Sequence, residues 1–273
     1  MSGTKDFLES NTLIAKTAFL LLVIILFFIL LRISISLLTW LLSPSQNMTL
    51  VNGIADATQS IIISQDPSSQ ASMPIIRSVN ESEGMEFTWS IWIFLKPVTA
   101  SSTASNFSHI FSKGVFNAGS LGICNPFSNN APGLYLSNAN TLTVVMDSTT
   151  TPGCKTDTNT PITIDNMPIN KWFNVVIRLT NNDLDVYING RLTDRKTISD
   201  GVPNQNYDDV YICQNGGFNG YIADLKYYNS SIGTSEINSI VSSGPNTNIN
   251  MSTLKNNMPP YLSGNWYDEK VSG

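Results

Sequence analysis

The acidic side chains are the first residues to consider for chemistry, because cleavage of a glycosidic bond needs two carboxylates held a few ångströms apart. The nearest groupings are Asp183 and Asp185 in the run DLD, and Glu81, Glu83 and Glu86 in the run ESEGME. We predict that the two aspartates form a solvated strand face beside a hairpin and that the glutamates lie in a loop. Neither grouping supplies a catalytic pair, so we expect the protein not to be an enzyme.

Other catalytic and metal-binding residues are equally sparse. His109 is the single histidine, and no G-x-S-x-G or Walker-type motif accompanies it, so a structural role is expected. Cys124, Cys154 and Cys213 lack CxxC spacing, which argues against a zinc site. The net charge of -5 and the absence of a Lys/Arg cluster argue against a nucleic-acid partner.

A sugar-binding site would combine an exposed aromatic ring with amide side chains at a rim. Phe127, Asn129 and Asn130 occur in CNPFSNNAPG, and Asn215 and Phe218 occur in QNGGFNG. These five residues are the candidate carbohydrate-binding set. The alternative is that both segments are ordinary turn-rich loops.

One long apolar run, TAFLLLVIILFFILLRISISLLTWLL at 17–42, precedes all of these segments. As a helix it would be roughly 39 Å long, enough to cross the hydrocarbon core of a bilayer with some tilt. A cleaved signal peptide would have a shorter apolar core and a small-residue cleavage site. We therefore predict a single-pass membrane anchor.

Lys16, Arg32 and Trp40 are the residues expected to fix this anchor in the membrane. Arg32 either snorkels from one long helix, pairs with a partner helix, or marks the membrane edge with Trp40 as an interfacial anchor. Lys5 and Lys16 precede the run, whereas 43–76 contains no Lys or Arg. The positive-inside tendency then leaves the N-terminus on the cytoplasmic or interior side of the membrane.

Beyond the anchor, 43–72 is mostly polar and punctuated by Pro and Gly, and we predict a stalk there, with SIII as a candidate for a short ordered piece. Apolar residues then alternate with a period of two in FTWSIWIFL, TLTVVM and WFNVVIRL. In DLDVYING the alternation ends at Asn189-Gly190, a favoured two-residue hairpin turn. Short strands with turn signals about every 8–12 residues predict an all-β sandwich of two antiparallel sheets.

The order EFTWSIWIFL, HIFSKG, NKWFNVVIRLTNNDLDVYINGRL and GFNGYIADLKYYNSSIGTSEI resembles that of the laminin-G-like, concanavalin A-like jelly-roll domain. The resemblance covers 73–245. It implies that the last strand, entered through the glycines of GGFNG, lies beside the strand at 87–95. It also implies a short closing helix that packs Ile237 and Ile240 against the sandwich.

A narrower likeness connects PIIRSVNESEGMEFTWSIWIF and DDVYICQNGGFNGYIADLKYYN with concanavalin A-like proteins encoded by nucleocytoplasmic large DNA viruses. Several of those also carry an N-terminal membrane span. The likeness implies a non-enzymatic virion protein whose jelly roll mediates protein contacts between membrane and capsid, in a minor capsid or assembly role. The alternative is a carbohydrate-binding, lectin-type attachment protein. Expected partners are therefore a lipid membrane, other virion or capsid proteins and, in the alternative, glycans.

Laminin-G-like domains often bind calcium through Asp side chains and carbonyls on a rim. Here SDGVPNQNYDD offers Asp200, Asp208 and Asp209 as calcium ligands, against the alternative of an ordinary polar loop. No other cofactor is expected.

The viral relatives imply a disulfide between a cysteine at the position of Cys154 and one shortly after the Asn-Gly hairpin. This sequence has RLTDRKTI after the hairpin, so a bridge would need Cys124 or Cys213 instead. The alternative is that all three thiols stay free.

These inferences divide the chain into five parts. They are an N-terminal tail at 1–16, a transmembrane helix at 17–42, a polar stalk at 43–72, the laminin-G-like domain at 73–245 and a C-terminal tail at 246–273.

Overall fold

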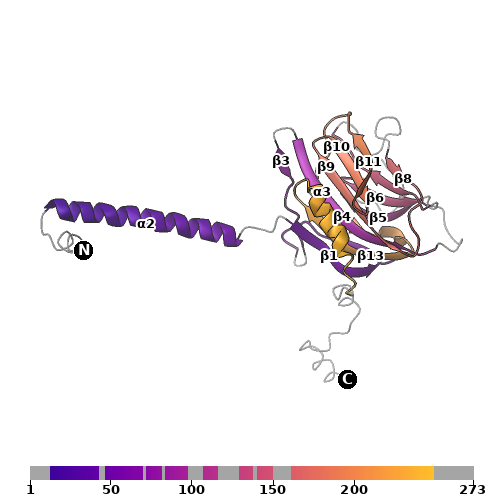
Figure 1. Ribbon diagram of the computed structural model, residues 1–273, viewed down its shortest axis with the longest axis horizontal. Helices are drawn as coiled ribbons and strands as arrows, with labels where there is room; N and C mark the ends of the chain where they lie inside the picture. The colour runs from indigo at the N-terminus through magenta and orange to yellow at the C-terminus, as the bar shows by residue number, and fades with distance from the viewer. Residues whose placement is uncertain are drawn as a thin grey trace, which may run out of the picture. The chain divides into compact units, whose positions relative to one another are not determined.

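The structure is a computed structural model that describes residues 13–42, 47–69, 72–81, 84–97, 107–115, 129–137, 140–149 and 161–248. The chain forms two compact units, Met1–Ser45 and Gln46–Gly273. The described part of the first unit is a helix, and that of the second is a β-sandwich with short helical elements (Figure 1). The predicted fold class, an all-β sandwich preceded by an apolar helix, is confirmed.

Helix α2 (Leu13–Leu42) is the apolar element of the first unit. Its stretch from Leu13 to Thr39 has a mean hydropathy of 3.0 and is long enough to cross a membrane. Most of its large apolar side chains are exposed, as expected for a helix that has no polar face. The helix runs through Arg32 without a break, so ISISLLTWLL belongs to the same element.

The second unit is built from two sheets of antiparallel strands that face each other. One sheet is seven-stranded, with the order β1-β13-β4-β9-β10-β11 and β3 paired to β4. The other is six-stranded, with the order β2-β12-β5-β6-β7-β8. The elements are β1 (Asn47–Asp56), β2 (Ile61–Ile63), β3 (Val79–Glu81), β4 (Gly84–Leu95), β5 (Phe107–Lys113), β6 (Gly133–Ser137), β7 (Leu142–Val145), β8 (Ile162–Ile164), β9 (Trp172–Thr180), β10 (Asp183–Ile188), β11 (Arg191–Thr197), β12 (Val210–Ile212), the 3-10 helix η1 (Gln214–Gly216), β13 (Gly220–Tyr228) and α3 (Thr234–Ser243).

The hydrophobic core lies between the two sheets. Trp89 of β4, Phe173 of β9 and Phe111 of β5 are among the largest fully buried side chains. The centroid of the Trp89 ring lies 5.2 Å from that of Phe111 and 5.0 Å from that of Tyr227 on β13. Alternate residues of a strand point to the same face, so the period of two seen in the sequence fills this interior from both sheets.

The prediction of a polar stalk over 43–72 is wrong, because two strands form there, of which only β2 coincides with the short ordered piece expected at SIII. β1 pairs with β13 at one edge of the seven-stranded sheet, and β2 pairs with β12 at one edge of the six-stranded sheet. Leu50 and Val51 of β1 are buried. The register of β1 shifts between Thr49 and Val51 and again between Val51 and Ile54, so its apolar residues do not alternate regularly. Because of this irregularity, the sequence of β1 does not show the period of two that indicates a strand.

Three local predictions are confirmed. Asn189 and Gly190 have φ values of 49° and 80° and connect β10 to β11. β13 pairs with β4, so the last strand does lie beside the strand at 87–95. Helix α3 packs Ile237 and Ile240 with Tyr228 in a cluster on the outer face of the seven-stranded sheet (Figure 1).

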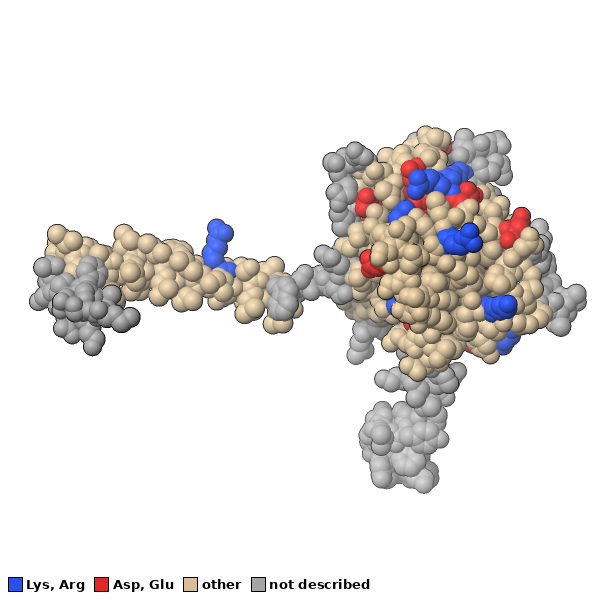
Figure 2. All heavy atoms as spheres, in the orientation of Figure 1, with Lys and Arg blue, Asp and Glu red and all other residues tan. Residues whose placement is uncertain are grey.

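The prediction of a solvated face beside the hairpin is wrong for Asp185. Its side chain is 1% exposed and accepts hydrogen bonds from Nη2 of Arg178, at 2.7 Å, and from Nε of Arg195. Nη1 of Arg178 also donates to the backbone oxygen of Ile232 at 3.1 Å, which ties the segment before α3 to the sheet. Charged residues are only 13% of the sequence and are sparse on the face drawn in Figure 2, so a buried carboxylate held by two arginines is a distinct structural feature.

Candidate functional site

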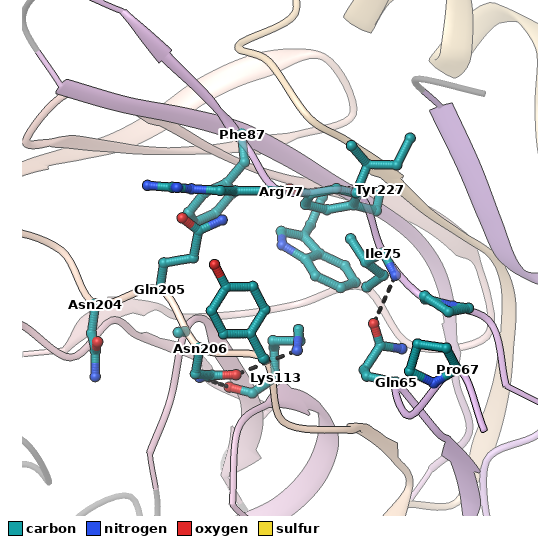
Figure 3. Close-up of a pocket in the computed structure, with 15 residues that line it drawn as sticks. Gln65, Pro67, Ile75, Arg77, Phe87, Lys113, Asn204, Gln205, Asn206 and Tyr227 are labelled. Atoms are coloured by element: carbon teal, nitrogen blue, oxygen red, sulfur yellow. Dashed lines mark hydrogen bonds between the residues drawn. The ribbon is translucent and has the colours of Figure 1, made fainter. Parts of the chain in front are cut away.

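A pocket of about 330 Å³ opens at one end of the sandwich, between the two sheets (Figure 3). Its walls come from β4, β5 and β13, and from two connecting segments at 65–77 and 204–207. The lining residues are Gln65, Pro67, Pro74, Ile75, Ile76, Arg77, Phe87, Trp89, Lys113, Ala131, Asn204, Gln205, Asn206, Tyr207 and Tyr227.

Three aromatic side chains form the inner wall of this pocket. Phe87 and Trp89 are two residues apart on β4 and therefore point to the same face of the sheet. Tyr227 is the partner of Trp89 on β13. These rings are at most 4% exposed, whereas Tyr207 at the pocket is 77% exposed. The pocket thus has buried rings at its base and one ring open to solvent.

Lys113, the last residue of β5, brings a charged group to the same pocket. It is 7% exposed. Its ammonium group donates to Oδ1 of Asn206 at 3.4 Å (Figure 3) and also to the backbone oxygen of Asp208. Burial lowers the pKa of Lys113 to about 8, although the charges of Asp208 and Asp209 act in the opposite direction. The ammonium is therefore protonated at neutral pH and bound to uncharged oxygens.

Hydrogen bonds fix the segment after β2 against the rest of the pocket. The backbone N–H of Gln65 donates to Oδ1 of Asp209 at 2.8 Å. The side-chain oxygen of Gln65 accepts the backbone N–H of Ile75, also at 2.8 Å (Figure 3). Arg77, farther along this segment, is exposed and is drawn across the pocket from Lys113 in Figure 3. Gln65 is therefore held by bonds to Asp209 and Ile75, and Arg77 adds a second cation to the pocket.

The fold and the order of its motifs correspond to one family. Residues 68–238 match the model for the concanavalin A-like lectin/glucanases superfamily, Laminin_G_3. The chain belongs to this family. Strands β1 and β2 lie N-terminal to the matched residues. Each of them forms an edge strand, β1 in the seven-stranded sheet and β2 in the six-stranded sheet.

Several solved structures are similar to this laminin-G-like protein. They include the ligand-binding domain of botulinum neurotoxin serotype D in complex with N-acetylneuraminic acid, at 15% identity and a TM-score of 0.48, over 72% of this chain and 46% of that chain. Trypanosoma rangeli sialidase is similar at 15% identity and a TM-score of 0.40, over 58% of this chain and 22% of that chain. The chain thus spans less than half the length of either structure. At this level of similarity, their ligands say nothing about the ligand of this chain. A comparison with curated proteins finds no match.

The predicted carbohydrate-binding residues are not brought together. Phe218 is 5% exposed and belongs to the core, so it is not the exposed ring that a sugar would stack on. Asn130 is 1% exposed, and its Oδ1 accepts the hydroxyl of Tyr135 at 2.6 Å. Asn129 accepts Nδ2 of Asn204 at 3.1 Å, Asn215 is exposed on η1, and Phe127 lies outside the described residues.

The two predicted loops lie toward opposite ends of β5. The backbone N–H of Ala131 donates to the oxygen of Lys113, whereas that of Gln214 donates to Nδ1 of His109. His109 and Lys113 are four residues apart on an extended strand, a separation of roughly 13 Å. A single small sugar would therefore not span these two positions on β5.

The predicted calcium ligands do not form a metal-binding group. In the described part of the chain, no group of three or more His, Cys, Asp or Glu side chains could hold a metal ion. Asp200, Asp208 and Asp209 therefore do not form such a group. Oδ1 of Asp209 accepts the N–H of Gln65, and the backbone oxygen of Asp208 accepts Lys113. The last two aspartates thus contact the pocket segments instead.

His109 and Cys213 are core residues. The Nε2 atom of His109 lies 2.9 Å from Oγ of Ser112, and burial lowers the pKa of this fully buried histidine to about 3. Cys213 is a free, buried thiol whose pKa burial raises to about 12. Cys124 and Cys154 lie outside the described residues. Both described groups are uncharged at neutral pH, which matches the structural role expected for His109.

The predicted anchor residues all belong to α2. Lys16 and Arg32 are exposed on the helix, and Trp40 lies in its last turn.

The pocket itself was not predicted from the sequence. Its lining residues run from Gln65 to Tyr227 and converge only in the folded chain. One local signal was available, because Lys113 ends the apolar strand sequence HIFSK with a charged residue. A lysine at the end of a buried strand either reaches solvent or is held by the fold, and Lys113 is held.

Proposed function

We propose that the protein is a membrane-anchored, non-enzymatic binding protein of the lectin type, whose pocket between the sheets holds one sugar-sized ligand. The observation that carries the proposal is the lining of that pocket. Aromatic rings form one wall, and amide side chains from Gln65, Asn204, Gln205 and Asn206 form another. Binding sites for small ligands commonly combine apolar surface with a few converging polar groups, in volumes from about 300 Å³ upward.

The same lining favours binding over hydrolysis. Cleavage of a glycosidic bond needs a pair of carboxylates, and the described residues that line the pocket include no Asp or Glu. Asp185, from the sequence-based candidate pair, is bound by two arginines on the other side of the seven-stranded sheet. A ligand in the pocket would thus be held and not cleaved.

Helix α2 serves as the membrane anchor in this proposal. Its apolar stretch of 27 residues exceeds the roughly 7–15 apolar residues of a cleaved signal peptide. The N-terminus then lies on the cytoplasmic or interior side, and the sandwich lies on the opposite side.

A glycan array probed with the full-length protein in lipid nanodiscs tests the proposal. We expect binding to a restricted set of glycans. Tyr207→Ala should weaken that binding several-fold without changing the fold, because the ring is 77% exposed at the pocket. Leu192→Ala, which removes a 48% exposed side chain on β11, is the matched control and should bind like the parent protein. The absence of any glycan binding would refute the proposal.

A second proposal is the contact role between membrane and capsid. The feature that favours it is the outer surface at the edge of the six-stranded sheet. Ile62 on the edge strand β2 is 58% exposed and is the cross-strand partner of Tyr211. An exposed apolar residue on an edge strand suits a protein partner. Cross-linking in purified particles, with Ile62→Asp as the test variant, should identify a neighbour that the variant loses. Unchanged neighbours in the variant would count against this role.

A further inference from the structure

We infer that the ligand of this pocket is an acidic saccharide, a pyranose bearing a carboxylate, and that the carboxylate binds the ammonium group of Lys113. The inference rests on the proposed binding function and specifies the chemical class of its ligand. Sialic and uronic acids share this chemistry.

The first support is the charge of the described lining residues. Lys113 and Arg77 both line the pocket, and none of the described lining residues is acidic. A small site with two cations and no lining anion favours a negatively charged ligand.

The second support is how Lys113 is hydrogen-bonded. An ammonium group has three N–H donors. Two are used by the backbone oxygen of Asp208 and by Oδ1 of Asn206, both of which are uncharged acceptors. Within the described part of the chain the ammonium group has no third acceptor, so the third N–H is available to a ligand. A carboxylate at that position would give a charge-assisted hydrogen bond, which is stronger than a bond between neutral groups.

The third support is the rest of the lining. The ring of Tyr207, which is 77% exposed at the pocket, offers a surface for the apolar C–H face of a pyranose. The amides of Gln205 and Asn204 offer both donors and acceptors for hydroxyl groups. The volume of about 330 Å³ is at the small end of ligand sites, which suits a single sugar residue.

The charged and titratable groups around Lys113 come from three parts of the chain. Asp208 and Asp209 precede β12, Arg77 follows β2, Tyr207 lies in the segment before β12, and Tyr227 lies on β13. The two aspartates do not line the pocket, and their charges favour the protonated form of Lys113. Burial raises the pKa of Tyr227 above its ordinary value, so this phenol stays neutral through the range in which Lys113 titrates.

Calorimetric titration of the full-length protein in nanodiscs of neutral lipid tests the inference. The probes are N-acetylneuraminic acid, glucuronic acid and the neutral sugar N-acetylglucosamine. We expect at least one acid to bind about tenfold or more tightly than the neutral sugar, and the two acids separate the sialic from the uronic class. Lys113→Met should remove this preference, so that neither acid binds more tightly than the neutral sugar. Lys171→Met, which alters an exposed lysine away from the pocket lining, should retain the preference.

A pH titration of the parent protein decides the matter if Lys113→Met does not fold. Affinity for the acid should fall as the pH rises through about 8, where Lys113 loses its proton, while affinity for the neutral sugar stays constant. Equal affinities for acidic and neutral sugars, or a flat pH profile, would overturn the inference but leave the binding function standing. Failure of all three sugars to bind, together with an empty glycan array, would overturn both.

Discussion

Asp185 and Lys113 are both buried charged residues, but their hydrogen-bond partners differ in charge. Asp185, on the outer face of the seven-stranded sheet, is held by the guanidinium groups of Arg178 and Arg195. Lys113, at the open end of the sandwich, is held by a backbone oxygen and an amide oxygen. The first charge is neutralised by its neighbours, whereas the second faces a pocket with only neutral oxygens as direct partners.

The difference separates a structural charge from a functional one. A buried carboxylate that accepts bonds from two arginines has little capacity left for a ligand, so its role is to hold elements together. A buried ammonium group beside a pocket keeps one N–H donor for a ligand. Its burial also costs free energy that its uncharged partners do not fully offset. Such groups are candidates for ligand binding, because a bound anion supplies the missing partner.

The largest effect should come from Asp185→Asn. The substitution leaves Arg178, only 16% exposed, without its carboxylate, and should lower the free energy of unfolding by about 3 kcal/mol. Urea unfolding of the full-length protein in detergent measures the loss. Asp194→Asn, on the exposed neighbouring strand, is the control and should change the free energy by less than about 0.5 kcal/mol. Equal losses in the two variants would remove the distinction drawn for Asp185.

Lys113→Met should act in the opposite direction on stability. Replacing a buried charge that has no carboxylate partner by an apolar side chain of similar length should raise the free energy of unfolding by about 1 kcal/mol at pH 7. The same urea experiment measures it. A loss of more than about 1 kcal/mol would show that Lys113 mainly holds the segment at 206–208, and that its role is structural like that of Asp185.

Asp185 and Lys113 should also change the free energy of unfolding at opposite ends of the pH range. Burial alone would raise the pKa of Asp185, but Arg195 and Arg178 outweigh it and hold that pKa below its ordinary value. This contribution to stability is present above about pH 4 and is lost as the pH falls through the folded-state pKa. For Lys113 the folded-state pKa is lowered to about 8, so stability should rise with pH from about 8 toward about 10.4. Unfolding free energies of parent minus variant, measured across pH, should show each slope, and flat differences would contradict both.

The smallest effect is expected at Arg195. Its side chain is 51% exposed, so solvent can replace much of what Asp185 provides. We expect Arg195→Ala to lower the free energy of unfolding by less than Arg178→Ala does, and by less than the size of the change expected for Lys113→Met. Urea midpoints of the three variants rank the sizes of their changes in stability. A larger loss for Arg195→Ala than for Arg178→Ala would show that Arg195, and not Arg178, is the more important partner of Asp185.

The features that the sequence predicted well were those with local causes. Asn189-Gly190 requires positive φ at both positions, the apolar residues that alternate in β4 and β9 mark the strand face turned to the core, and Ile237 with Ile240 marks the packed side of a helix. Each of these can be read from fewer than ten neighbouring residues. The family resemblance followed from their order.

The features that the sequence did not predict depend on contacts between distant residues. β1 was assigned to a stalk because its two register shifts break the alternation. Phe218, between glycines, had the pattern of an exposed loop aromatic but packs into the core. The pocket forms only when the tertiary fold brings Gln65, Lys113 and Tyr227 together, and no local sequence pattern predicts that contact.

The position of β1 at a sheet edge has a consequence for biosynthesis. Asn47 of β1 pairs with Tyr228 of β13, so the strand leaves the ribosome about 180 residues before its partner, a delay of roughly 10 to 40 s at ordinary translation rates. During that interval the nascent strand has an unpaired backbone and apolar side chains without a core to enter. Closure of this sheet is therefore a late, non-local event, and the nascent chain is expected to depend on chaperones until β13 emerges.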